Sequence, residues 1–202
     1  MSCYTREQIE ETMASKGYKY FTGGDYDVNI IGVRNSETKN KVTNKFDDCV
    51  TLSYKIEGEW KFHCFKATTD PGTHWVENIM RKDGVAILKP GQYRGSHKLR
   101  LHAGKYLALG QQKPVKVYRD NNRDNNYDLL EENVQEGIFG INIHRATSRS
   151  GGTSTRIDKW SAGCQVIADN DDWYEFLDIC QTAREIWGNS FTYSLLESKD
   201  IV

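Results

Sequence analysis

The strongest constraint on the fold of this chain is a series of short apolar runs that turn-forming residues interrupt from about residue 28 onward. Val28–Val33, Cys49–Ile56 and Trp60–Thr68 are rich in β-branched and aromatic residues, and the last two flank Glu57-Gly58-Glu59, a typical hairpin connection. Short strands at this spacing predict a β-rich domain. Further runs of the same kind cover residues 84–88, 106–109, 115–118, 138–144 and 191–196, and we expect 138–144 to be an interior strand.

Two segments predict helices instead. Thr5 and Gln8 have the spacing of a capping box, and the helix that they begin is expected to end near Gly17. After Asp169, apolar residues recur with a period of 3.6 until Gly188. This pattern predicts a longer amphipathic helix near the C-terminus.

The composition excludes several classes of protein. Hydrophobic residues make up 38% of the 202 residues, which suffices for a folded core. Lys and Arg number 27 against 28 Asp and Glu, so a surface for nucleic acid is not expected, and no apolar run is long enough to cross a membrane. We expect a mainly β, α+β fold in which residues 1–20 form a peripheral helix and residues 21–202 form a single domain.

The five cysteines cannot all pair within one chain, because their number is odd. The N-terminal residues contain no apolar signal region, so we expect synthesis in the cytoplasm, where thiols stay reduced. Cys49, Cys64 and Cys180 lie on apolar strand or helix faces and are interpreted as core residues. Cys3 has no assigned role, which leaves Cys164 as the candidate for chemistry.

Cys164 ends the element Ser161-Ala162-Gly163-Cys164, between a long polar loop and an apolar run. Gly163 permits an unusual backbone conformation before the sulfur, and successive backbone N–H groups there could stabilise an oxyanion. A nucleophilic cysteine also needs a base, and His144 lies at the end of an expected strand, with sixteen residues between it and Ser161. The pattern indicates a nucleophile and its base, and the alternative is a buried structural thiol.

The pattern His-x16-Ser-x-Gly-Cys resembles the signature of the L,D-transpeptidase catalytic domain over roughly residues 140–168. The resemblance implies a β-rich domain with two sheets and acyl transfer from peptidoglycan stem peptides through a cysteine thioester. It implies that Cys164 is the nucleophile and His144 the general base. It also implies backbone oxyanion donors at Gly163 and Cys164, a supporting role for Ser161 in the turn, and no cofactor for catalysis.

The chain differs from the family pattern at three positions. Ala162 stands where the family usually has a second histidine, Val166 where it usually has an arginine, and Arg145 where it usually has a small residue. Hydrolysis and transfer therefore both remain open. The expected absence of a signal peptide favours a phage endolysin or virion-associated lysin that acts on the cell wall. A non-catalytic virion module that keeps the fold is the alternative.

Three arginines near the motif are candidates for binding the carboxylates of stem peptides, because a guanidinium binds a carboxylate through two hydrogen bonds. They are Arg145, Arg149 and Arg156, and Trp160 is a candidate wall of the same pocket. The alternative is that the arginines are solvated loop residues and that Trp160 only packs. His97 and His102 are candidates for a second polar group at the site, and their spacing gives little support to a zinc site.

An acidic loop after residue 119 follows the twelve-residue pattern of a calcium loop, with Asn125 where glycine is usual. Calcium there would be structural, because hard oxygen ligands do not activate a thiol. The alternative is an Asx-rich turn without metal. The candidate ligands are Asp120, Asn122, Asp124, Asp128 and Glu131.

Overall fold

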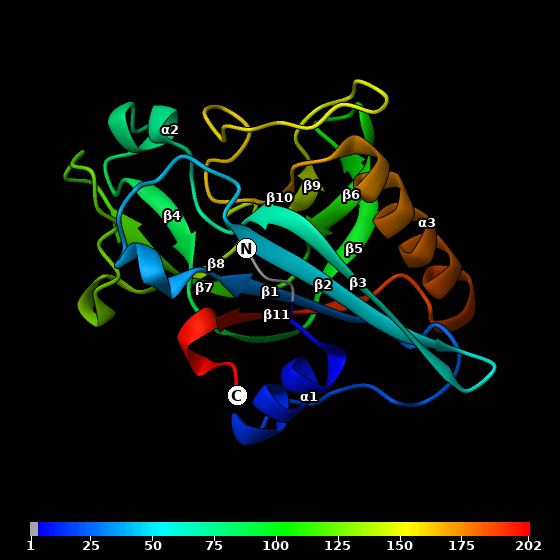
Figure 1. Cartoon of the computed structure of the whole chain (residues 1–202). Coiled ribbons are helices and arrows are strands. Elements are labelled where there is room, and N and C mark those ends of the chain that lie inside the picture. The colour runs from blue at the N-terminus through cyan, green and yellow to red at the C-terminus, as the bar shows by residue number, and fades with distance from the viewer. Residues whose placement is uncertain (1–3) are drawn as a thin grey trace.

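The computed structural model describes residues 4–202, so Cys3 lies outside the described residues. Within this range the helices are α1 (Arg6–Ser15), α2 (Thr73–Glu77) and α3 (Asn170–Trp187). The strands are β1 (Asn29–Arg34), β2 (Asp48–Ile56), β3 (Glu59–Thr68), β4 (Val85–Leu88), β5 (Gly91–His102), β6 (Tyr106–Gln111), β7 (Val115–Asp120), β8 (Gln135–Gly137), β9 (Ile143–Arg145), β10 (Gln165–Ile167) and β11 (Phe191–Glu197). The expected β-rich character is confirmed, as are the two expected helices (Figure 1).

Eight of the strands close into a barrel in the order β1-β11-β5-β6-β9-β10-β3-β2. The pairs β1–β11 and β9–β10 are parallel, and the other pairs are antiparallel. The remaining strands form a separate three-stranded sheet in the order β4-β7-β8. Residues 4–202 thus form two sheets, one of them a closed barrel.

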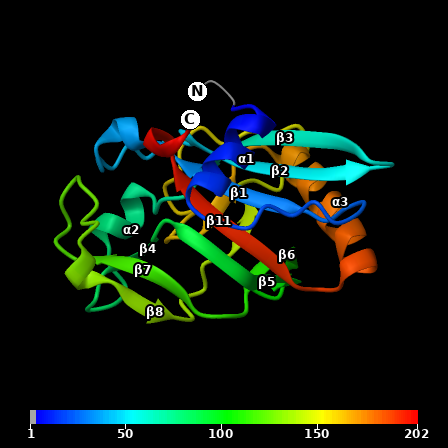
Figure 2. The ribbon, with the colours of Figure 1, turned by 90° about the horizontal axis from the view of Figure 1, so that it is seen from below.

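The barrel interior and one face of α3 form a single hydrophobic core. Trp173, Phe176 and Cys180 of α3 are buried in the same cluster as Leu52 and Phe65 of the barrel. Both views of the ribbon place α3 at one end of the barrel and the β4-β7-β8 sheet at the opposite end (Figures 1 and 2). The short strands β9 and β10 therefore lie between a helix-covered end and a sheet-covered end.

Helix α1 packs against the outside of the barrel. The Thr5 side chain accepts a hydrogen bond from the backbone N–H of Gln8, and the Gln8 side chain accepts one from Thr5, which confirms the capping box. Ile9 and Met13 are fully buried with Ile31 of β1. The few apolar residues of α1 are therefore enough to fix it on the barrel.

The expected interior strand over residues 138–144 is wrong for most of its length, because β9 begins only at Ile143. Residues 139–141 are held by one side chain: Oε1 of Gln111 accepts hydrogen bonds from their three backbone N–H groups at 2.9–3.1 Å. Gly140 adopts a φ of +77° in this segment. The irregular backbone leaves the carbonyl of Gly140 free to contact Cys164.

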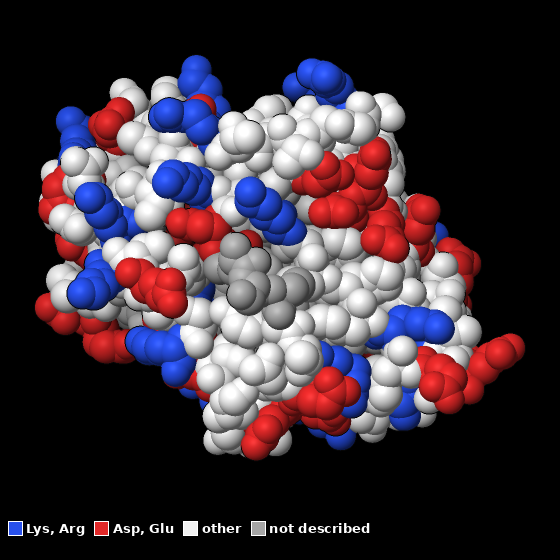
Figure 3. Space-filling model, in the orientation of Figure 1, with Lys and Arg blue, Asp and Glu red and all other residues white. Residues whose placement is uncertain are grey.

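The surface carries both signs of charge. In the orientation of Figure 1, basic and acidic side chains are interspersed, and acidic side chains gather over the first half of α3 (Figure 3). None of the helices among residues 4–202 has the length and apolar content needed to cross a membrane.

Candidate active site

Ser161 closes the turn that carries Cys164. Its hydroxyl accepts a hydrogen bond from the backbone N–H of Gly163 at 3.1 Å and donates one to the carbonyl of Cys164 at 2.8 Å. Gly163 adopts a φ of +122°, and a Cβ at this position would lie 2.1 Å from the carbonyl oxygen of Ala86 in β4. The turn therefore requires glycine for two reasons, its backbone conformation and its contact with the smaller sheet.

The hydrogen bond from the N–H of Gly163 to the hydroxyl of Ser161 removes one of the two expected oxyanion donors. Because the N–H of Gly163 is already donated to Ser161, it is not available to a developing oxyanion, contrary to the role that the resemblance implied. The backbone N–H of Cys164 has no hydrogen-bond partner among the described residues. It is therefore the one backbone donor of the expected pair that this turn leaves available.

The Cys164 thiol is protonated at neutral pH. Sγ donates a hydrogen bond to the carbonyl of Gly140 at 3.3 Å. Burial raises the pKa of the thiol to about 11, and a hydrogen bond from the backbone of Asn142 offsets this only in part. Cys49 and Cys180, the other free thiols among the described residues, are buried in apolar surroundings and have pKa values raised further.

His144 lies on β9 with its ring orientation fixed by the backbone. Nδ1 is 2.8 Å from the carbonyl oxygen of Arg145. Because a carbonyl oxygen only accepts, we assign the proton of the neutral ring to Nδ1, which leaves the lone pair on Nε2. Burial lowers the pKa of His144 to about 4, so this neutral form persists at pH 7.

Cys164 lies one residue before β10, and His144 lies on the neighbouring parallel strand β9. His144 pairs with Val166, and Cys164 precedes Val166 by two residues. Since side chains alternate along a strand, His144 and Cys164 point to the same face, with Cα atoms about 8 Å apart from standard strand dimensions. No hydrogen bond joins them within residues 4–202, because Sγ is turned to Gly140.

Further side chains from β5 and β6 complete this face. The ring of His102 stacks on His144 with a centroid distance of 4.4 Å, and Tyr106 lies 5.4 Å from His102. His102 is thus the second polar group that the sequence predicts near the site. His97 is instead buried inside the barrel, where it contacts the carbonyl of Ile141 and the hydroxyl of Ser96, each at 2.8 Å.

None of the side chains expected to bind substrate lines the cavity beside Cys164. Arg145 stacks on Tyr106 at 4.4 Å and donates a hydrogen bond to the hydroxyl of Tyr174 at 2.9 Å. Arg156 is exposed and pairs with Asp158. Arg149, Arg156 and Trp160 are all absent from the lining of the cavity beside Cys164.

That cavity has a volume of about 310 Å³ and extends from Cys164 to the smaller sheet. Trp75 of α2 and Phe139 supply aromatic walls, and Ala162 lies at the position before Gly163. Arg81 and Arg119 also line it. The sequence did not indicate either arginine, because both precede Cys164 by more than 40 residues and reach it only through the packing of the two sheets.

The acidic loop after β7 brings four of the expected calcium ligands close together. The side chain of Asn122 donates to Asp124 at 3.1 Å and to Asp128 at 3.0 Å. Asp120 is 1% exposed, and neither of its carboxylate oxygens accepts a hydrogen bond of normal geometry. Burial and the charges of Asp128 and Asp124 raise the pKa of Asp120 to about 6.

The fifth expected ligand points away from this loop. Glu131 forms an ion pair with Lys89 and accepts a hydrogen bond from the hydroxyl of Tyr118. Among residues 4–202, no three His, Cys, Asp or Glu side chains form a group suited to a metal ion. The calcium prediction therefore depends on Asp120, Asn122, Asp124 and Asp128, together with backbone oxygens.

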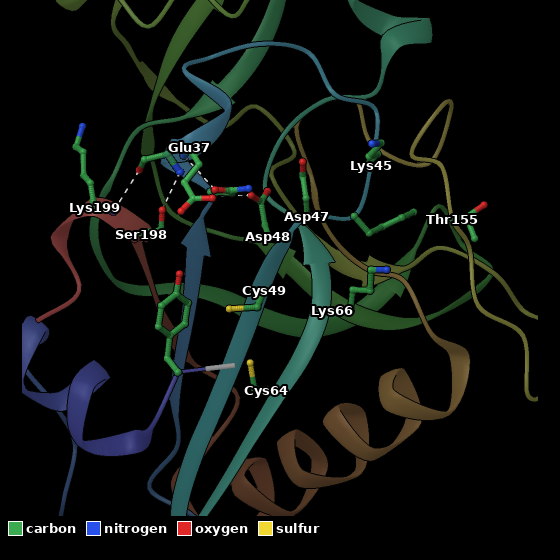
Figure 4. Close-up of a pocket in the computed structure, with 14 residues that line it drawn as sticks. Glu37, Lys45, Asp47, Asp48, Cys49, Cys64, Lys66, Thr155, Ser198 and Lys199 are labelled. Atoms are coloured by element: carbon green, nitrogen blue, oxygen red, sulfur yellow. Dashed lines mark hydrogen bonds between the residues drawn. The ribbon is translucent and has the colours of Figure 1, made fainter. Parts of the chain in front are cut away.

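A second cavity, larger than the one beside Cys164, lies away from that residue. Its volume is about 1140 Å³, and Cys49, Cys64 and residues flanking β1–β3 line it (Figure 4). Three lysines and three acidic residues line it, so the charges balance and the cavity favours neither an anionic nor a cationic ligand. These six are Lys45, Lys66, Lys199, Glu37, Asp47 and Asp48.

Comparison with known proteins leaves the site to be interpreted from its chemistry. No protein-family model, curated protein or solved structure matches the chain.

Proposed function

We propose that this protein is a cysteine-dependent acyl-transfer enzyme in which Cys164 is the nucleophile and His144 the general base. The observation that supports this best is the arrangement of His144. Its Nδ1–H is held by the carbonyl of Arg145, so Nε2 carries a lone pair on the strand face shared with Cys164. A base oriented in this way beside a cysteine is what nucleophilic catalysis requires.

The proposed reaction begins when the thiol leaves the carbonyl of Gly140. Sγ attacks the carbonyl carbon of a peptide bond while its proton passes to Nε2 of His144. The carbon–nitrogen bond then breaks, and His144 returns the proton to the leaving amine. Water or an amine next attacks the thioester, and Cys164 regains its proton when the new acyl product leaves.

Cys164 and His144 are both neutral before substrate binds, and this determines when the proton is transferred. Because the pKa of Cys164 is raised and that of His144 lowered, a thiol and an imidazole coexist at pH 7, not a thiolate and an imidazolium. Proton transfer must therefore accompany the attack on substrate. This is general-base catalysis, to which such a proton transfer contributes about 100- to 10,000-fold in rate.

We propose peptidoglycan stem peptides as the substrates. The support is the resemblance of His144 and residues 161–164 to the L,D-transpeptidase signature. The cavity of about 310 Å³ beside Cys164 is large enough for a short peptide segment. Hydrolysis and transfer use the same first half-reaction, so this proposal covers both outcomes.

Purified sacculi test the proposal directly. Wild-type protein should release peptides or form new cross-links that mass spectrometry detects, and Cys164→Ala and His144→Gln should lose this activity. Cys49→Ala is the matched control, because it removes a buried thiol of β2 that does not line the cavity beside Cys164, and it should keep the activity. Products that persist in Cys164→Ala would overturn the assignment.

A non-catalytic binding module is the alternative, and one observation favours it. The thiol is satisfied by the carbonyl of Gly140 and has a raised pKa, as a structural cysteine would. Binding of wild-type protein to sacculi, with no change in their peptides and equal binding by Cys164→Ala, would establish this alternative.

A further inference from the structure

The cavity beside Cys164 has an unusual distribution of charge. Its lining is otherwise apolar or small, yet it includes Arg81 and Arg119 and no Asp or Glu. Arg81 comes from the loop before β4, and Arg119 comes from β7. Two cations without a lining anion make this cavity electropositive.

Arg119 is fixed in place by neutral groups. Its Nε donates to the side-chain oxygen of Gln135 at 2.9 Å, and its Nη1 donates to the carbonyl of Gly84 at 3.3 Å. The guanidinium lies 4.8 Å from the ring centroid of Phe139. These contacts orient the group without neutralising it, and Nη2 has no partner among the described residues.

The charge of Arg119 is only weakly compensated. The residue is 9% exposed, and burial lowers its pKa. Asp83 opposes that effect from the exposed loop before β4, but no acidic side chain within residues 4–202 forms a salt bridge with Arg119. A poorly solvated cation without an anion is unfavourable, so an anion that enters the cavity gains more than it would at an exposed arginine.

We propose that this cavity is a carboxylate subsite in which Arg119 is the anchor, Arg81 adds a second positive charge, and the bound carboxylate belongs to the peptide that Cys164 attacks. The peptide part of this statement rests on the proposed function. The preference for an anion beside Cys164 does not, because it follows from the lining of the cavity. The subsite replaces the expected use of Arg145 and Arg156.

The position of Arg145 supports this assignment. Its guanidinium is already stacked on Tyr106 and bonded to Tyr174, outside the cavity. Arg119 has a free Nη2 and shares the cavity with Cys164. A ligand with its carbonyl at Sγ and its carboxylate at Arg119 would therefore lie within this cavity, whose lining also includes Gly140 and Ala162.

Two alkylating reagents of similar size test the subsite without any enzymatic assay. Iodoacetate carries a carboxylate and iodoacetamide does not, and both form a C–S bond with Cys164 as iodide leaves. The quantity measured is the rate of alkylation of Cys164 by iodoacetate divided by its rate with iodoacetamide, which peptide mass spectrometry follows at one alkaline pH. We expect this ratio to fall about five- to tenfold in Arg119→Gln. Arg81→Gln should lower the ratio less, and Arg119→Lys should retain part of it.

Matched controls keep the test decisive. Arg94→Gln removes a cation that stacks on Phe21, far from this cavity, and should leave the ratio unchanged. If Arg119→Gln unfolds, Arg81→Gln gives the same test from an exposed loop. A ratio that does not change in either variant, or that falls only in Arg145→Gln, would overturn the subsite. Inactivity on sacculi with a preserved iodoacetate preference would instead refute the proposed function alone.

Discussion

At the scale of single residues, the neutral form of His144 is the property on which the proposed chemistry depends. Burial lowers the pKa of His144 to about 4, from an ordinary value near 6.5. A base is active when unprotonated, so activity should fall only as the pH drops through about 4. NMR titration of His144 in Cys164→Ala measures this without turnover, and a titration near pH 6.5 would contradict the buried, carbonyl-bound ring.

The reactivity of Cys164 gives a second prediction at this scale. Because burial raises the pKa of the thiol to about 11, its alkylation by iodoacetamide should accelerate about tenfold per pH unit from pH 7 to pH 10. Cys49, with a pKa raised to about 12, should react more slowly at every pH. A rate that levels off near pH 7 would show a preformed thiolate and contradict the neutral pair.

The residues that the sequence could indicate are those whose roles are local. Cys164, Ser161 and His144 stand at a recognisable spacing, and the structure places Ser161 and Cys164 in the turn before β10 and His144 on the adjacent strand β9. Arg119 carries no such signal, because it meets Cys164 only where the two sheets pack. The N–H of Gly163 was misassigned because sequence spacing does not show that a serine hydroxyl already accepts it.

At the scale of elements, the turn before β10 depends on its contact with β4. Gly163→Ala would place a methyl group 2.1 Å from the carbonyl of Ala86, so we expect a loss of at least about 2 kcal/mol in the free energy of unfolding. Gly140→Ala is the matched control. Its φ is also positive, but nothing lies within 4 Å of its Cβ, so its cost should be about 1 kcal/mol.

Chemical denaturation with circular dichroism measures both glycine variants. A comparable loss in the two would show that backbone strain alone matters. That result would contradict the role of β4 in positioning Cys164.

The loop after β7 carries the calcium prediction. Asp120 is buried without a hydrogen-bond partner of normal geometry, so a cation that neutralises it should stabilise the fold. We expect millimolar calcium to raise the melting temperature of wild-type protein by several degrees and to leave that of Asp120→Asn with Asp124→Asn unchanged. An equal shift in both proteins, or none in the wild type, would leave the loop as an Asx-rich turn.

Elements were predictable where local patterns decide them. The capping box at Thr5 and the apolar period of α3 gave the correct helices. The apolar pattern of residues 138–142 predicts a strand, because it cannot reveal that the side chain of Gln111, from β6, accepts hydrogen bonds from three of their N–H groups. The apolar runs do not indicate strand β5, because polar and basic residues interrupt its apolar ones.

At the scale of the whole molecule, closure of the barrel decides which polar groups become buried. A sequence that predicts many strands does not say whether their outer members pair, and here β1 pairs with both β2 and β11 to close the sheet. In the closed barrel His97 is fully buried and His144 is only 5% exposed. Their protonation is therefore linked to folding of the entire domain.

That linkage predicts how stability depends on pH. His97 and His144 have folded pKa values lowered to about 4, mainly by burial, so the unfolded chain binds more protons between pH 6.5 and pH 4. The contribution of these two histidines to the free energy of unfolding must therefore decrease as the pH is lowered across this window. The decrease is at most about 3 kcal/mol for each histidine between pH 7 and pH 4. Burial raises the pKa of Asp48 to about 7, which gives the opposite slope, so the test compares variants.

The experiment measures the free energy of unfolding by urea at pH 7 and pH 4 for wild type and for His97→Gln. A glutamine at this position can still donate to the carbonyl of Ile141, but it does not titrate. The pH-dependent loss should be smaller in His97→Gln by up to about 3 kcal/mol, whatever the contribution of Asp48. Equal losses in the two proteins would mean that His97 is already charged, or already exposed, in the folded barrel.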